Sequence, residues 1–208
     1  MKLFLCSHLV TPNIKQDFEQ FVGKSSEACS VSLVITAANP MKDKSWMYRD
    51  IEYARELFKE VEVFDIEKMS SHEMRSQFMS RDILYLNGGN TSYLMKKVRE
   101  RGLEKLLEDI LSEVVYVGSS AGSMIWSKSL EIAQWYPGGE EPGASKVPGI
   151  GLLDFQIFPH YQEGMLEVIR ENKLKDQEYW LLKNGQAMSY EDGEIKTYGG
   201  EIKILPKE

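Results

Sequence analysis

The sequence predicts an α/β fold in which helices cover both faces of a doubly wound, mostly parallel sheet. Five short apolar runs, rich in β-branched and aromatic residues, recur along the first 118 residues. Segments with helical periodicity separate these runs, and strands that alternate with helices are typical of a parallel sheet. The predicted strands are Lys2–Cys6, Val31–Thr36, Val61–Asp65, Ile83–Asn87 and Val114–Gly118.

Helical periodicity is clearest in two of the segments between strands. An apolar stripe begins with Trp46 and continues at three- and four-residue spacing through Ile51, Ala54, Leu57 and Phe58, and Ser92–Leu107 repeats this pattern. Such a stripe marks one face of an amphipathic helix. After about residue 130 the pattern is lost, and Pro-Gly pairs crowd the chain up to Pro148-Gly149. This stretch predicts a long loop.

The C-terminal part predicts antiparallel strands. Asn184-Gly185 and Asp192-Gly193 each lie between short alternating runs, and such dipeptides are typical of hairpin turns. We therefore expect hairpin strands to complete one edge of the sheet. With 208 residues, the chain is expected to form one domain over residues 1–208.

The charge pattern argues against a nucleic-acid partner. The chain has 25 basic and 32 acidic residues, a net charge of −7, and the two signs alternate along it. Binding to phosphates needs a basic stripe. The segment that comes closest, Lys96–Arg101, is interrupted by Glu100, which is typical of a solvated helix face.

Cysteine usage and hydropathy predict a cytosolic protein. Cys6 and Cys29 are the only cysteines, and neither lies in a CxxC motif, so buried free thiols are expected in place of a disulfide or a metal site. The N-terminal run Leu3–Leu5 is too short for a signal-peptide core. No apolar stretch approaches the roughly 18 residues of a membrane span, so no membrane partner is expected.

The strongest signal for chemistry is Gly118-Ser119-Ser120-Ala121-Gly122, directly after the fifth predicted strand. It matches the G-x-S-x-G nucleophile elbow and precedes a helix-compatible segment, as that motif requires. A serine on so sharp a turn needs small neighbours, and the two glycines and the alanine supply them. The motif predicts Ser120 as a nucleophile. The alternative is an ordinary capped turn with Ser119 or Ser120 as the N-cap.

A serine hydroxyl needs a positioned base, and histidine is the usual one. Of the three histidines, His8 follows the first strand, His72 resembles an exposed residue at the start of a helix, and His160 follows the strand-like run Phe155–Pro159. In open α/β sheets the working site lies beyond the carboxyl ends of the strands. Ser120 and His160 are therefore expected to project into the same space, and we predict His160 as the base.

A second strand-to-turn-to-helix segment, Asn87-Gly88-Gly89-Asn90-Thr91, follows the fourth predicted strand. A paired-glycine turn can offer backbone N–H groups to a bound phosphate or to a tetrahedral oxyanion. The alternative is a tight turn with Thr91 as the N-cap. Because the serine turn comes one strand later, we predict that Gly88 or Gly89 contributes to an oxyanion hole.

These two motifs, followed by Pro159-His160-Tyr161, resemble the peptidase E family of cytosolic aspartyl dipeptidases, which is related to the cyanophycinases. The resemblance spans most of the chain. It implies a fold like that of class I glutamine amidotransferases, with Ser120 as nucleophile and His160 as base. It also implies an oxyanion hole made by the Gly88 turn and the Ala121 amide, no metal or other cofactor, and a homodimer.

One feature departs from the family pattern. The family's triad places an aspartate on the loop between nucleophile and histidine, but counting from either residue leads to Trp135 or Gly138. By analogy with the Asp→Asn change in a serine-protease triad, loss of the carboxylate would lower the rate by about four orders of magnitude.

Four other carboxylates are candidates for orienting His160. Glu140 is the first choice and Glu141 the second, since both lie on the loop that the aspartate would occupy. Glutamate's extra methylene group gives either side chain additional reach. Glu131 and Asp154 are more distant candidates.

Arg170 is the candidate residue for substrate selection. It lies beside the apolar stripe of a helical segment, Glu167–Asn172, and an arginine can hold a carboxylate through two hydrogen bonds. The family's Arg-Glu pair after the histidine resembles Arg170-Glu171 here, which implies selection of an acidic side chain. The alternative is an exposed arginine paired with a glutamate on the same helix.

The sequence thus predicts a serine peptidase that hydrolyses short peptides, in particular dipeptides of the Asp-Xaa type. One alternative is a catalytically silent relative that binds a peptide or an acidic metabolite in the same cleft. An esterase is a further alternative, weakened because the chain contains no separate HGGG-like oxyanion segment.

Overall fold

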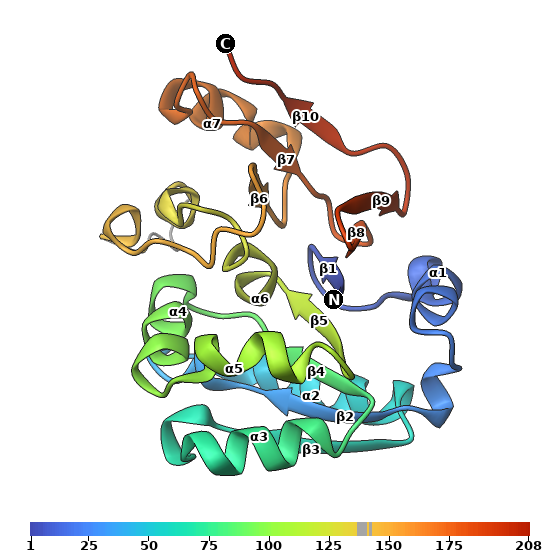
Figure 1. Cartoon of the computed structure of the whole chain (residues 1–208). Helices are drawn as coiled ribbons and strands as arrows, with labels where there is room; N and C mark the ends of the chain where they lie inside the picture. The colour runs from blue at the N-terminus through green and yellow to red at the C-terminus, as the bar shows by residue number, and fades with distance from the viewer. Residues whose placement is uncertain (137–140, 142) are drawn as a thin grey trace.

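The computed structural model describes residues 1–136, 141 and 143–208, and its main sheet has seven strands in the order β3-β2-β4-β5-β1-β8-β9 (Figure 1). The strands from β3 to β1 in this order run parallel, whereas β8 and β9 are antiparallel to their neighbours. The bounds are β1 Lys2–Cys6, β2 Ser30–Val34, β3 Glu60–Phe64, β4 Ile83–Leu86, β5 Val115–Ser119, β8 Ala187–Glu191 and β9 Glu194–Tyr198.

Helices cover both faces of this sheet. Successive residues of a strand point to opposite faces, and here both sets of side chains are apolar, so helices bury each face. Leu3 and Leu5 pack in the cluster formed with α3, α4 and α5, whereas Phe4 and Cys6 pack with α1 and α2. The predicted doubly wound α/β class is therefore confirmed. The helices are α1 Pro12–Val22, α2 Ser45–Leu57, α3 Ser71–Met79, α4 Thr91–Glu100, α5 Leu103–Ile110, α6 Ala121–Met124 and α7 Leu166–Asn172.

A second, smaller sheet has the order β10-β7-β6. Its strands are β6 Gln156–Phe158, β7 Tyr179–Leu181 and β10 Lys203–Leu205; β6 and β7 are parallel, and β10 is antiparallel to β7. The short helix α6, which follows β5, contacts both β4 and β6. The smaller sheet therefore lies beyond the carboxyl ends of the main parallel strands (Figure 1).

Two local predictions were wrong. The segment Ser92–Leu107 does not form one helix, because Gly102 adopts a left-handed conformation (φ 78°) that ends α4 and starts α5. Asn184-Gly185 does not form a hairpin turn, since it connects β7 of the smaller sheet to β8 of the main sheet. Asp192-Gly193 does turn the chain between β8 and β9, with φ positive at both residues, as a type I′ hairpin requires.

Cys6 and Cys29 are free and buried, as predicted. None of the helices in the described part of the chain combines the length and the apolar character needed to span a bilayer. Within residues 1–136, 141 and 143–208, no group of three or more histidine, cysteine or acidic side chains is arranged to hold a metal ion.

Candidate active site

The predicted site residues meet at the carboxyl ends of three adjacent strands. β4, β5 and β1 are neighbours in the main sheet and run parallel, so the residues that follow them emerge at one edge. Gly88 follows β4, Ser120 follows β5 and His8 follows β1. Together they line a cleft of about 270 Å³. Its lining residues are His8, Met41, Trp46, Asp50, Gly88, Gly89, Ser119, Ser120 and His160.

Ser120 adopts a backbone conformation that a non-glycine residue rarely occupies, with φ 50° and ψ −109°. Such strain persists only where the surroundings enforce it, and it is concentrated at functional sites. The Ser120 N–H donates to the carbonyl of Cys6 in β1 at 3.2 Å, and the Ser120 carbonyl accepts from Met124 N at 2.9 Å. The Ser120 side chain makes no capping hydrogen bond to α6, so its hydroxyl is available in the cleft.

Glycines on either side of Ser120 allow the turn to pack this tightly. A Cβ atom at Gly122 would overlap the backbone carbonyl of Leu86 in β4, and one at Gly118 would lie 2.6 Å from the Gly122 oxygen. Real Cβ atoms do not approach backbone atoms so closely. The small residues of the motif therefore let α6 lie directly against the neighbouring strand.

We expect Gly122→Ala to reduce the free energy of unfolding by about 1–3 kcal/mol, because the added methyl group meets backbone that cannot rotate away. Denaturant unfolding would measure the change. Gly164→Ala is the matched control, since no atom lies within 4 Å of its added Cβ. Equal stability of the two variants would contradict this account of the turn.

The Gly88-Gly89 turn lies against Ser120. A Cβ atom at Gly88 would lie 3.2 Å from Ser120 Cβ, and one at Gly89 (φ 134°) would overlap the carbonyl of Ala37. Within the part of the chain that the structure describes, neither glycine N–H has a hydrogen-bond acceptor. Both groups are therefore available to an anion in the cleft. Ala121, the first residue of α6, follows Ser120 directly.

His160 enters the cleft from the smaller sheet, where it follows β6. Its backbone is in the left-handed region (φ 55°), and its N–H donates to Ser7 Oγ at 2.7 Å. Ser7 is fully buried after β1 and donates in turn to the carbonyl of Leu182 at 2.9 Å. One buried hydroxyl thus ties the histidine backbone to both sheets.

The partner of the His160 side chain is Asn184, which the sequence did not predict as a site residue. His160 Nδ1 lies 2.7 Å from Asn184 Oδ1. An amide oxygen only accepts hydrogen bonds, so Nδ1 carries the proton and Nε2 keeps its lone pair. Asn184 follows β7, the parallel neighbour of β6, and an asparagine directly after a strand-like run is the sequence signal that could have identified it.

The surroundings of His160 favour its neutral form. Burial lowers the pKa of His160 below its ordinary value, the hydrogen bond from Nδ1 to Asn184 offsets part of this effect, and repulsion from His8 lowers the pKa further. The two imidazole rings have centroids 5.6 Å apart. At neutral pH the ring can therefore accept a proton. No hydrogen bond joins Ser120 to His160 among the described residues, and such contacts often tighten only when substrate binds.

The predicted carboxylate partners have other places in the structure. Glu140 lies outside the described residues. Glu141 is buried and caps α4, where its two oxygens accept from the N–H groups of Thr91 at 2.6 Å and Ser92 at 2.8 Å.

The two more distant candidates also have their own partners. Glu131 accepts a hydrogen bond from Tyr179 at 2.9 Å, and Asp154 forms an exposed ion pair with Lys128. None of the described carboxylates bonds to the imidazole of His160.

Arg170 lies on an exposed face of α7, in a hollow that it shares with Glu163, Glu167 and Glu171. It is not among the residues that line the Ser120 cleft. The structure therefore does not bring Arg170 together with the predicted nucleophile and base.

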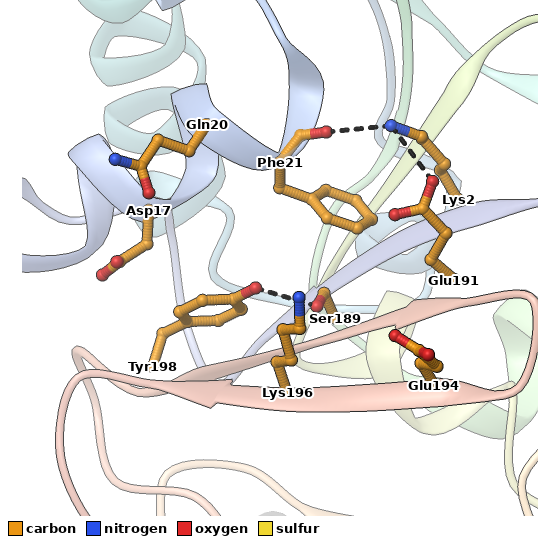
Figure 2. Close-up of a pocket in the computed structure, with 9 residues that line it drawn as sticks. All are labelled: Lys2, Asp17, Gln20, Phe21, Ser189, Glu191, Glu194, Lys196 and Tyr198. Carbon is orange, nitrogen blue, oxygen red and sulfur yellow. Dashed lines mark hydrogen bonds and ion pairs between the residues drawn. The ribbon is translucent and has the colours of Figure 1, made fainter.

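A further hollow of about 280 Å³ lies between α1 and the β8–β9 hairpin, and Figure 2 shows its lining. Lys2 Nζ lies 3.2 Å from both the Phe21 carbonyl and a Glu191 carboxylate oxygen, and Ser189 Oγ lies 3.0 Å from the Tyr198 hydroxyl. These polar groups are therefore already paired with one another through hydrogen bonds and an ion pair. None of the predicted site residues lines this hollow.

A parallel sheet with a serine on a strained strand-to-helix turn and a histidine in the same cleft is typical of α/β serine hydrolases. Comparison with known proteins narrows this class. Residues 7–198 match the model of peptidase family S51, so the chain belongs to that family.

Individual relatives agree with this assignment. The chain is 29% identical over 144 residues to an uncharacterized peptidase of Listeria monocytogenes, covering 66% of this chain and 70% of that protein. It is 26% identical over 215 residues to peptidase E of a Nostoc species, covering 93% and 81% of the two chains. The resemblance to the peptidase E family is thereby confirmed, and the protein is a serine-type peptidase by family.

Solved structures show the same fold. A Listeria monocytogenes protein assigned to peptidase E superposes with a TM-score of 0.78 at 23% identity, over 96% of this chain and 98% of that one. A peptidase from an acI-B1 actinobacterium superposes with a TM-score of 0.68 at 14% identity, over 99% and 94%.

We expect Asn184→Ala to lower kcat/KM for peptide hydrolysis about 100-fold or more, because an unrestrained imidazole loses its tautomer and orientation. The base must be neutral to act, so wild-type kcat/KM should rise through the lowered pKa of His160 and level off above it. In Asn184→Asp the carboxylate stabilises the imidazolium and raises this pKa. The acidic limb of the pH profile should therefore move to higher pH.

The control variant is Asn172→Ala, whose exposed side chain donates to the Val168 carbonyl on the same helix. It should leave both kcat/KM and the pH profile unchanged. An unaltered acidic limb in an active Asn184→Asp variant would contradict the assignment of Asn184 as the partner of His160.

Proposed function

We propose that the protein hydrolyses short peptides with Ser120 as nucleophile and His160 as general base. One observation carries this proposal: Ser120, His160, Gly88 and Gly89 line one cleft, and the N–H groups of the two glycines have no acceptor among the described residues. Membership of peptidase family S51 supports the same reaction class.

The geometry supports a two-step acyl transfer. His160 Nε2 takes the Ser120 proton as Oγ attacks the scissile carbonyl carbon, and the N–H groups of Gly88, Gly89 and Ala121 stabilise the resulting oxyanion. The imidazolium then protonates the leaving amine as the C–N bond breaks. In the second step His160 removes a proton from water, which attacks the acyl-enzyme and releases Ser120.

The size of the cleft favours a short substrate. Its volume of about 270 Å³ is near the lower end of the range for small-molecule sites. Such a space accommodates the residues next to one scissile bond and not an extended polypeptide. Trp46 and Met41 form an apolar wall for a substrate side chain.

The predicted preference for Asp-Xaa dipeptides depended on Arg170, which lines a different hollow. No lysine or arginine is among the residues described as lining the Ser120 cleft, and its one acidic residue is Asp50. Hydrolysis of Asp-Xaa beside Asn-Xaa dipeptides tests the preference directly. The cleft itself favours substrates whose N-terminal residue has no negative charge on its side chain.

A second candidate function follows from Asn184, since a neutral amide stabilises an imidazolium less than a carboxylate does. A catalytically silent relative would bind a peptide in this cleft without cleaving it. We favour catalysis because the Asn184 oxygen still holds the productive tautomer of His160, as in the Cys-His-Asn sites of papain-like proteases. Binding of a dipeptide without release of its products would support the silent alternative.

We expect Ser120→Ala and His160→Ala each to abolish nearly all hydrolysis of short peptides, and the double variant to be no worse than either single one. Residues that act as a unit in catalysis show strongly non-additive losses. Steady-state kinetics on a dipeptide series would measure this. Substantial activity in Ser120→Ala would exclude Ser120 as the nucleophile. The control is His72→Ala, at an exposed position on α3, which should keep full activity.

A further inference from the structure

Asp50 is a nearly buried carboxylate in the wall of the cleft that contains Ser120. It projects from α2, and only 8% of the residue is exposed. Burial raises the pKa of the Asp50 carboxyl group, although the hydrogen bond from Asn87 and the nearby His8 act in the opposite direction. A carboxylate in such a place needs a compensating partner to remain charged.

Its partners within the described residues satisfy only one of its two oxygens. Asp50 Oδ2 accepts from Asn87 Nδ2 at 3.1 Å. Asp50 Oδ1 lies 3.9 Å from His8 Nε2, which is beyond hydrogen-bond length. The Asn87 amide oxygen is itself buried without a partner in this part of the chain. Asp50 Oδ1 is therefore the unused acceptor in the wall of the cleft, within the described residues.

The position of Asp50 relative to the reacting groups is fixed through Asn87. Asn87 holds the carboxylate and immediately precedes Gly88, the residue that lies against Ser120. In a peptide, the α-ammonium nitrogen is two covalent bonds from the first carbonyl carbon. A peptide whose α-ammonium group binds Asp50 would therefore present its first carbonyl group, and not a later one, to Ser120.

Building on the proposed peptidase function, we propose that Asp50 is the residue that binds the free α-ammonium group of a short peptide substrate. Ammonium–carboxylate hydrogen bonds are stronger than neutral ones, and a partly dry cleft strengthens them. The Met41–Trp46 wall then receives the side chain of the N-terminal residue.

The test compares alanyl p-nitroanilide with its N-acetyl derivative. We expect the wild-type enzyme to cleave the free amine in preference to the acetylated substrate. Asp50→Asn should lower kcat/KM for the free amine roughly 10- to 100-fold, which is the change that loss of one charge-assisted hydrogen bond produces. Cleavage of the acetylated substrate should fall far less, since it carries no ammonium group, so the preference for the free amine should be lost. The Asp50→Asn substitution keeps the shape of the side chain, and Glu52→Gln, at an exposed position on the same helix, is the matched control.

Other outcomes would overturn the proposal. Equal loss on both substrates would mean that Asp50 supports the Gly88 turn through Asn87 and does not select the substrate. Preference for an Nα-acetyl-lysyl anilide, lost in Asp50→Asn, would assign Asp50 to a basic side chain.

A fluorophosphonate probe, which carries no ammonium group, separates this inference from the function on which it rests. Labelling of Ser120 combined with equal cleavage of the free and acetylated anilides would reject the role of Asp50 alone. A wild-type protein that neither reacts with the probe nor cleaves either anilide would reject the peptidase function, and the role of Asp50 with it.

Discussion

The contact between Gly122 and the Leu86 carbonyl is the constraint on which the site depends. It brings the turn after β5 directly against β4, so the Ser120 turn and the Gly88 turn come to share one space. The hydrogen bond from Ser120 N to the Cys6 carbonyl connects the same turn to β1. Three strands, which a large core holds in register, thereby enforce the strained backbone conformation of Ser120.

The smaller sheet contributes the groups that would activate the serine. β6 and β7 are parallel neighbours, so His160 and Asn184 emerge from the same edge and meet. Ser7 joins this edge to the end of β1. Catalysis would therefore depend on the docking of two sheets, and the α-ammonium role of Asp50 would add a third element, α2, to the same cleft.

The sequence predicted the parallel strands and the grouping of Ser120, His160 and Gly88 because these features follow from local periodicity and from short motifs. It did not predict Asn184, because the Asn184-Gly185 pair is also a hairpin signal and was interpreted as one. The meeting of Asn184 with His160 depends on the pairing of β6 with β7, and these strands of three residues each do not specify that pairing in the sequence. Glu141 was misplaced for a related reason, since capping of α4 across 50 residues of chain depends on tertiary packing alone.

The most direct test of the central claim, an activated Ser120, is reaction with a fluorophosphonate probe followed by peptide mapping with mass spectrometry. The account predicts one adduct at Ser120 in the wild-type protein, formed far more slowly in His160→Ala because the base is missing. Labelling at another serine, or an equal rate at Ser120 in His160→Ala, would contradict it.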